Sequence, residues 1–224
     1  MPIKIQQTAE MKAPSLVLCI YGQGGVGKTT LATTAPKPIF IDAEQGTKAL
    51  GARGIDVPVV QVKSWKEIVE AWKLIQEKDY ETIIIDPVGK FLDLLIEEEK
   101  KGSNMTLQKW GFVKDRMRKF IWAIKESGKH VIFVAHEKID NDDQSLVRRP
   151  DLAANLSGEL VNLCDVVGHM RIDNEGIRTL RVQPEPKVTA KDRFDAVGDK
   201  MDKPNITEMI KLVHEAYNKE PFKS

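Results

Sequence analysis

The segment Gly22-Gln23-Gly24-Gly25-Val26-Gly27-Lys28-Thr29 decides the fold, because it fits the phosphate-binding pattern G-x-x-x-x-G-K-S/T. An apolar run precedes it and a helical pattern follows it, which is the context that this motif requires. Its glycines allow a tight turn in which backbone N–H groups face the phosphates. The motif predicts an ATP site in which Lys28 reaches the β- and γ-phosphates and the Thr29 hydroxyl binds Mg²⁺. The predicted phosphate loop consists of Gly22, Gln23, Gly24, Gly25, Val26, Gly27, Lys28, Thr29 and Thr30.

Around this loop, short apolar runs alternate with longer amphipathic stretches, as strands and helices do in a parallel sheet. Strands are expected at about residues 15–21, 38–42, 58–62, 82–86 and 130–135. A capping box at Ser64 and Glu67 predicts a helix that continues to about Asp79. Thr106 begins another predicted helix, which stops at Gly128. The predicted fold class is therefore α/β, with a mainly parallel central sheet flanked by helices.

The C-terminal part of the chain has a different pattern. Residues 166–172 and 177–182 flank a polar turn and predict an antiparallel hairpin. Asn205 and Glu208 then predict the start of a terminal helix. Between these parts, the stretch from Glu137 to Leu156 is polar and lacks a clear period. We expect a long loop there, and such loops are commonly functional or disordered.

The composition is that of an ordinary globular protein, with 42% hydrophobic and 30% charged residues among 224. Its longest apolar run, 15–21, is too short to cross a bilayer, and 1–12 contains no apolar signal segment. Cys19 and Cys164 form no disulfide framework or metal cluster, so we expect reduced thiols, a cytoplasmic location and no membrane partner. The expected organisation is an N-terminal arm at 1–14, a core at 15–200, and a helix and tail at 201–224.

The net charge of +1 gives the whole molecule no strong attraction to a polyanion. Any nucleic-acid site would have to be local. Basic residues gather between 109 and 119, where the favoured interpretation is the solvated face of a helix. They gather again at Arg148 and Arg149.

Two predicted strands end in carboxylates, which a Mg-ATP site needs beside its phosphate loop. Asp86 is the predicted second Mg²⁺ ligand, with a structural helix cap as the alternative. Pro87 follows it directly, so this strand lacks the second acid of an Asp-Glu pair that would polarise water. The general base must come from elsewhere. Asp42-Ala43-Glu44 provides two acids where the strand at 38–42 ends.

This Asp-Ala-Glu segment resembles that of RecA-like ATPases, and the resemblance makes Glu44 the general base that orients the attacking water. The alternative is a surface carboxylate in a loop. In RecA-like cores a polar residue at the end of a later buried strand senses the γ-phosphate. This implies that role for His136, although a histidine there can be purely structural. The loop after it would contact single-stranded DNA through Arg148 and Arg149, and the acidic run at 140–143 counts against that step.

Lys191-Asp192-Arg193-Phe194 resembles the Lys-x-Arg-Phe signature of RadA-type and KaiC-type members, whose cations reach the ATP of a neighbouring subunit. On this resemblance Lys191 and Arg193 would stabilise transition-state charge in trans. Hydrolysis would then require a homo-oligomer, either a ring or a filament. The alternative is a solvated basic turn.

Residues 15 to about 195 together resemble the compact RecA-core ATPases of phages, including the Sak group of single-strand annealing and recombination ATPases. The resemblance implies a RecA-like fold, ATP-dependent binding to single-stranded DNA, and a role in recombination or replication in the host cytoplasm. Three other classes stay open. A ParA-type ATPase would carry a lysine at Gln23, and a nucleotide kinase would need an arginine-rich lid, for which only Arg148 and Arg149 could serve. An ATP switch that controls a protein partner would not need DNA.

Overall fold

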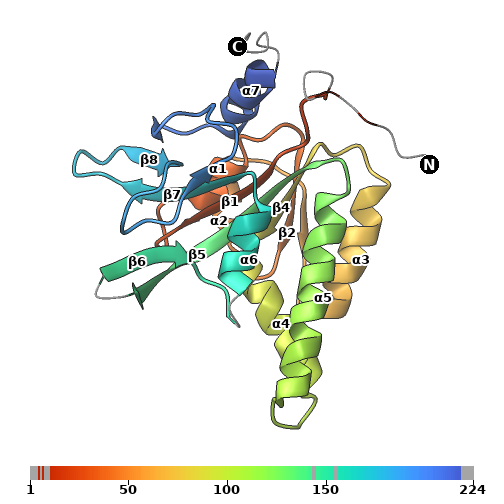
Figure 1. Cartoon of the computed structure of the whole chain (residues 1–224). Coiled ribbons are helices and arrows are strands. Elements are labelled where there is room, and N and C mark those ends of the chain that lie inside the picture. The colour runs from red at the N-terminus through yellow and green to blue at the C-terminus, as the bar shows by residue number, and fades with distance from the viewer. Residues whose placement is uncertain (1–4, 6, 8–10, 143–144, 154–155, 218–224) are drawn as a thin grey trace.

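A central sheet with helices on both faces forms the core of the protein (Figure 1). The structure, a computed structural model, describes residues 5, 7, 11–142, 145–153 and 156–217. The strands are β1 (Val17–Gly22), β2 (Pro38–Asp42), β3 (Val59–Gln61), β4 (Thr82–Asp86), β5 (His130–Asp142), β6 (Ser145–Pro150), β7 (Val166–Ile172), β8 (Arg178–Arg181), β9 (Lys191–Asp192) and β10 (Lys200–Asp202). Their order across the sheet is β10-β8-β7-β1-β5-β4-β2-β3, with β6 paired to β5 and β9 to β7.

The strand pairs from β7 through β1, β5, β4 and β2 to β3 are all parallel. β7 and β8 form an antiparallel hairpin, and β10 continues the sheet beyond it. β1 lies in the middle and is buried along its whole length, so its sequence is apolar at every position instead of alternating. The predicted α/β fold, with a mainly parallel sheet and a C-terminal antiparallel hairpin, is confirmed.

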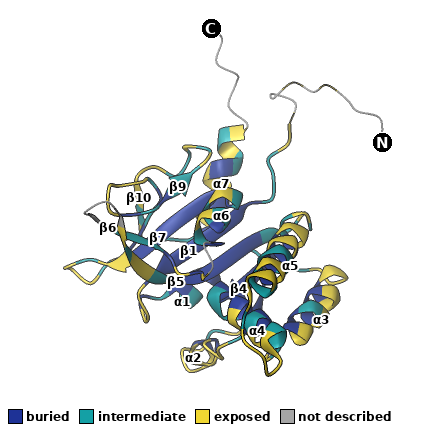
Figure 2. Ribbon diagram, turned by 60° about the horizontal axis from the view of Figure 1, so that its bottom comes forward, coloured by how far each residue is buried: buried dark blue, intermediate teal, exposed yellow. Residues whose placement is uncertain are grey.

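Helices cover both faces of the sheet, and the buried sheet lies between their exposed outer surfaces (Figure 2). One face packs against α3 (Trp65–Gln76), α4 (Val88–Lys100), α5 (Leu107–Lys125) and α6 (Leu156–Leu163). The other packs against α1 (Lys28–Ala32), α2 (Lys48–Gly51) and α7 (Ile206–Tyr217). Strand side chains alternate between the two cores, as Cys19 and Ile20 of β1 do.

The helix starts expected from the sequence are confirmed by their capping hydrogen bonds. The Ser64 hydroxyl accepts from the Glu67 N–H at 3.2 Å, and the Thr106 hydroxyl caps α5 in the same way. The Asn205 side chain accepts from the Glu208 N–H at 3.1 Å before α7. Each side chain satisfies an N–H group that has no partner inside its helix.

The expectation of a long loop from Glu137 to Leu156 is wrong. β5 continues to Asp142 and pairs with β6 as an antiparallel hairpin that projects from the sheet (Figure 1). The sequence shows no apolar period there because neither face of the hairpin is packed inside a core. Two of the acids at 140–143 fall in β5, and Asp140 pairs with Lys138 at 2.8 Å. Asp143 lies outside the described residues.

Two arginines of α5 pair with carboxylates of neighbouring helices, which agrees with the favoured interpretation of a helix surface. Arg116 pairs with Glu98 and Glu99 of α4, and Arg118 pairs with Glu159 of α6. Most of the expected arm at 1–14 lies outside the described residues. In the described part of the chain, no helix has the length and apolar character needed to span a membrane.

Candidate nucleotide-binding site

The phosphate loop follows β1 and leads into α1, as its sequence predicts. Gly22 lies so close to β7 that a Cβ atom there would be 2.2 Å from the Met170 carbonyl oxygen. Gly27 has a φ of 102°, and a Cβ atom on it would be 2.9 Å from Nε of Arg178. The structure therefore requires glycine at both positions. Gly22 allows the close approach to β7, and Gly27 allows both the left-handed backbone and the close approach to Arg178.

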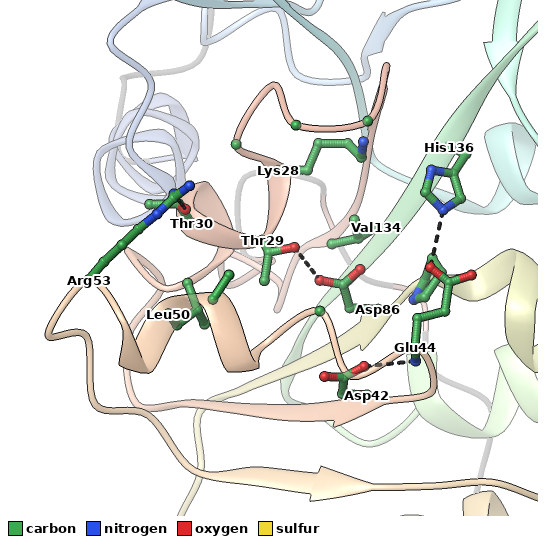
Figure 3. Close-up of a pocket in the computed structure, with 16 residues that line it drawn as sticks. Lys28, Thr29, Thr30, Asp42, Glu44, Leu50, Arg53, Asp86, Val134 and His136 are labelled. Carbon is green, nitrogen blue, oxygen red and sulfur yellow. Dashed lines mark hydrogen bonds and ion pairs between the residues drawn. The ribbon is translucent and has the colours of Figure 1, made fainter.

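Lys28 lies on the inner side of the loop with only 7% of its surface exposed (Figure 3). Its ammonium donates to the carbonyl oxygens of Gly22 and Gln23, each at 2.8 Å. Burial lowers the pKa of Lys28, while the nearby Asp86 carboxylate opposes that shift. A buried cation beside a negatively charged ligand would regain the stabilisation that it loses by leaving water.

The Thr29 hydroxyl donates to a carboxylate oxygen of Asp86 at 2.7 Å, so the two predicted Mg²⁺ ligands meet (Figure 3). Asp86 ends β4, and burial raises its pKa to about 6. A divalent cation would compensate for this desolvated charge, so the pair fits Mg²⁺. Among the described residues, no group of three or more His, Cys, Asp or Glu side chains could hold a metal. The remaining ligands would come from phosphates and water, as Mg²⁺ sites commonly arrange them.

Asp42 supports the segment that carries Glu44. Its buried carboxylate accepts hydrogen bonds from the backbone of Glu44 at 2.9 Å and of Thr47 at 3.0 Å, and from the Gln61 side chain at 3.0 Å. Burial alone would raise the pKa of Asp42, but a hydrogen bond from the Thr47 hydroxyl, together with these three, outweighs it and lowers the pKa. The sequence interpretation gave no role to Asp42, although its place at the end of a buried strand is the same as that of Asp86.

Glu44 and His136 approach each other across the cavity, with 3.3 Å between a Glu44 carboxylate oxygen and Nε2 of His136 (Figure 3). Glu44 lies two residues after the end of β2, His136 lies within β5, and β4 lies between those strands. Both side chains are about half exposed, at 43% and 50%. The predicted general base and the predicted γ-phosphate sensor therefore share one cavity with Lys28, Thr29 and Asp86.

A second cavity runs beside α1 and was not foreseen. Arg178 of β8 donates from Nε to the Val26 carbonyl oxygen at 3.1 Å, and Arg53 donates to the Thr30 hydroxyl at 3.0 Å. Both guanidinium groups line this cavity together with apolar side chains of Leu31, Met170, Ile177 and Pro204. Arg178 comes from the hairpin predicted at 166–182, but the sequence does not indicate that the hairpin folds over the phosphate loop.

The structure does not bring Lys191 and Arg193 into the cavity. Lys191 donates to three carbonyl oxygens at the end of α6, those of Val161, Asn162 and Cys164, at 2.8–3.1 Å. Arg193 pairs with Asp165 at 2.6 Å. β9 lies beside the first two residues of β7, whereas the phosphate loop follows the last residue of β1. Their action on a neighbouring subunit stays a prediction.

Arg148 and Arg149 are neighbours on β6, and their side chains point to opposite faces of the hairpin. Arg148 lies 3.6 Å from Glu137, and Arg149 lies 3.8 Å from Asp140. Neither arginine lines the cavity that holds Lys28. Their contact with DNA also stays a prediction.

Comparison with known proteins agrees with this geometry. The SPbeta prophage-derived uncharacterized protein YorG of Bacillus subtilis (strain 168) is 26% identical over 138 residues. That match covers 55% of the chain and 42% of YorG, so it reaches less than half of the relative's length. A family described as an AAA domain matches residues 15–194, which include the phosphate loop and both strand-end carboxylates. The chain therefore belongs to this AAA_24 family of AAA-type P-loop ATPases.

Proposed function

We propose that this chain binds and hydrolyses Mg-ATP and couples the reaction to single-stranded DNA. The observation that supports hydrolysis is the convergence of Lys28, Glu44 and Asp86 on one cavity. Lys28 would offset the charge of the phosphates. Glu44 would accept a proton from the attacking water, and His136 would hold the Glu44 carboxylate until a nucleotide enters.

Thr29 and Asp86 would hold the magnesium ion, whose chemistry is to offset negative charge on the phosphate oxygens. The donor set supports this assignment, since a hydroxyl and a carboxylate are oxygen ligands of the kind that Mg²⁺ prefers. The burial of Asp86 supports it further, because a nearby cation lowers the cost of keeping that carboxylate ionised.

The nucleoside part of ATP would occupy the second cavity. This cavity adjoins the first at Gly27, Thr30 and Arg53, which line both. Its apolar wall suits a flat base, and guanidinium groups can stack on aromatic rings. We propose Arg53 and Arg178 as the residues that hold the base and ribose.

The proposed role in recombination or replication, within the host cytoplasm, rests on resemblance to the Sak group. The prophage origin of YorG supports a phage context. β5 supports a link between the two activities, because it carries His136 at the nucleotide cavity and continues into the hairpin with Arg148 and Arg149. We propose assembly into a ring or filament, in which Lys191 and Arg193 act on the ATP of a neighbouring subunit.

A second candidate is an ATP switch that controls a protein partner. The observation that favours it is that Lys191 and Arg193 both contact polar groups of their own chain. In that case nucleotide exchange would change the chain's surface, and DNA would have no effect.

ATP turnover measured with and without single-stranded DNA tests the proposal. The parent protein should hydrolyse ATP faster with DNA, and Lys28→Ala should bind ATP at least roughly tenfold more weakly. Turnover that is indifferent to DNA would favour the switch and leave the ATPase standing. Undiminished ATP binding by Lys28→Ala would remove the nucleotide site itself.

A further inference from the structure

A third cavity also adjoins the phosphate loop. Gly24 and Gly25 line both this cavity and the nucleotide cavity, so the two adjoin at the loop. Its other walls come from the β5–β6 hairpin, the end of β7 and the segment 185–188. In Figure 1 the β5–β6 and β7–β8 hairpins both project to the left of the view.

Three cations from three segments line this cavity: Arg148 of β6, Arg171 of β7 and Lys187. Arg171 and Lys187 are exposed, and within the described part of the chain neither forms an ion pair. The segment carrying Lys187 is held against β6, since the Arg148 N–H donates to the Lys187 carbonyl oxygen at 2.9 Å. Backbone pairing therefore places all three cations, and Arg171 and Lys187 stay available to a ligand, whereas Arg148 lies 3.6 Å from Glu137.

The two carboxylates of the cavity already have partners. Glu137 is 5% exposed and lies 2.6 Å from Nε2 of His169. Glu185 pairs with Arg181 at 3.0 Å. Burial lowers the pKa of His169, while Glu137 opposes that shift. Since a neutral His169 does not offset the charge of Glu137, that charge is offset by Arg148 at 3.6 Å. Arg171 and Lys187 remain without a carboxylate partner among the described residues, so the cavity favours an anion.

Exposed aliphatic side chains extend the cavity along the hairpin. Ile139 lies directly opposite Arg148 in the β5–β6 register, and Leu146 lies two residues before Arg148, so all three share one face. Ile139 is 49% exposed and Leu146 58% exposed. A single strand presents phosphates and unpaired bases together, whereas a duplex hides its bases in the stack. Cations beside exposed aliphatic groups match the single strand.

We propose that this third cavity binds the backbone of single-stranded DNA, with Arg148, Arg171 and Lys187 at the phosphates and Ile139 and Leu146 against the bases. This inference rests on the proposed function and goes beyond it, because it assigns the site to residues of three segments and leaves Arg149 on the other face. Since Gly24 and Gly25 line both cavities, a bound strand would contact the same loop that holds the nucleotide.

The test compares two double variants that each remove two positive charges. Arg171→Ala/Lys187→Ala alters the cavity, and Lys66→Ala/Lys73→Ala removes exposed charges from α3. Fluorescence anisotropy with a labelled oligothymidine of about 20 nucleotides measures affinity at several salt concentrations. The cavity variant should bind roughly tenfold or more weakly, with a log–log salt slope shallower by about 1.4. The α3 variant should bind like the parent.

Unfolding curves of each variant show that it folds, and Lys187→Glu, a single change at an exposed side chain, gives a second test of the same contact. If both cavity variants bind the oligonucleotide like the parent, the third cavity is not the DNA site, while the DNA-linked function stands. If both double variants weaken binding equally, only net charge matters and the location is likewise overturned. If the parent binds no single strand at all, or binds a duplex equally well, the proposed function or its strand specificity fails instead.

Discussion

Nε2 of His136 lies 3.3 Å from a carboxylate oxygen of Glu44, although 92 residues separate them in the chain. Glu44 follows β2, and His136 lies within β5 at the last position that pairs with β1. Both therefore lie at the edge where the carboxyl ends of the parallel strands meet. Because Glu44 contacts His136, a movement of His136 would change the position of the Glu44 carboxylate. The pair therefore links the proposed proton acceptor to β5 and its hairpin.

Replacing Glu44 with Gln should abolish hydrolysis and leave ATP binding intact. The amide keeps the shape of the side chain but cannot accept a proton, so turnover should fall by roughly a hundredfold or more. Steady-state phosphate release and equilibrium binding of a fluorescent ATP analogue measure the two effects. Glu70→Gln, an exposed carboxylate of α3, is the matched control and should hydrolyse ATP like the parent. Full turnover by Glu44→Gln would place the base elsewhere.

Asp86→Asn should stabilise the nucleotide-free protein while weakening Mg²⁺-dependent ATP binding. Burial raises the pKa of Asp86 from 3.8 to about 6, so the native state binds the proton more tightly than the unfolded chain. Protonated Asp86 therefore adds to the free energy of unfolding at low pH, and this contribution is lost as the pH rises through about 6. Asp86→Asn removes the charge and should raise the free energy of unfolding by up to roughly 3 kcal/mol at pH 8. The gain should be smaller at pH 5.

Urea unfolding at both pH values measures this gain, and Asp42→Asn is its contrast. The pKa of Asp42 is lowered by its hydrogen bonds, so its charge stabilises the native state above the unfolded pKa. Asp42→Asn should therefore destabilise the protein at pH 8. A loss of stability in Asp86→Asn would contradict the burial argument.

Arg178→Ala should weaken binding of ATP but not of inorganic tripolyphosphate. Arg178 lines the cavity proposed for the nucleoside, whereas Lys28 lines the cavity proposed for the phosphates. Loss of a guanidinium contact corresponds to roughly tenfold in affinity for ATP. Lys28→Ala should weaken both ligands, and calorimetric titration compares them. If Arg178→Ala lost the same affinity for both ligands, the contact of Arg178 with the Val26 carbonyl oxygen would mainly hold the loop in shape.

Lys191→Ala should lower the free energy of unfolding by about 1–2 kcal/mol, because one ammonium satisfies three carbonyl groups at the end of α6. Urea unfolding measures the change. Lys200→Ala removes an exposed lysine of β10 and should change stability by less than about 0.5 kcal/mol. Equal stability of Lys191→Ala and the parent would show that this contact contributes nothing to folding.

Mixing Glu44→Gln protein with Arg193→Ala protein tests the shared site. Each should be inactive alone, and the mixture should regain partial turnover because some interfaces combine an intact Glu44 with an intact Arg193. Sedimentation must show that both variants assemble. Absence of recovery in assembled protein would assign Arg193 to its ion pair with Asp165 alone.

Local patterns predicted most of the framework and part of the site. Sequence spacing was sufficient to find features that depend on a few consecutive residues. These are the phosphate loop, the strand ending at Asp86 and the helix caps at Ser64 and Thr106. The β5–β6 hairpin was missed because its side chains are not packed inside a core, which removes the period-2 signal. Asp42 was passed over because its partners Thr47 and Gln61 are identified only by the folded chain.

By itself the sequence determined that a glycine-rich turn joins a buried strand to a helix, and that acids follow two other strands. Only the tertiary structure decided which of those groups meet. In the folded chain Glu44 lies beside His136, and Arg178 contacts the phosphate loop. Lys191 contacts the end of α6, and Arg171 and Lys187 line one cavity. The physical reason is that turns and strands follow from neighbouring residues, whereas the meeting of side chains depends on strand order and packing between segments far apart in the chain.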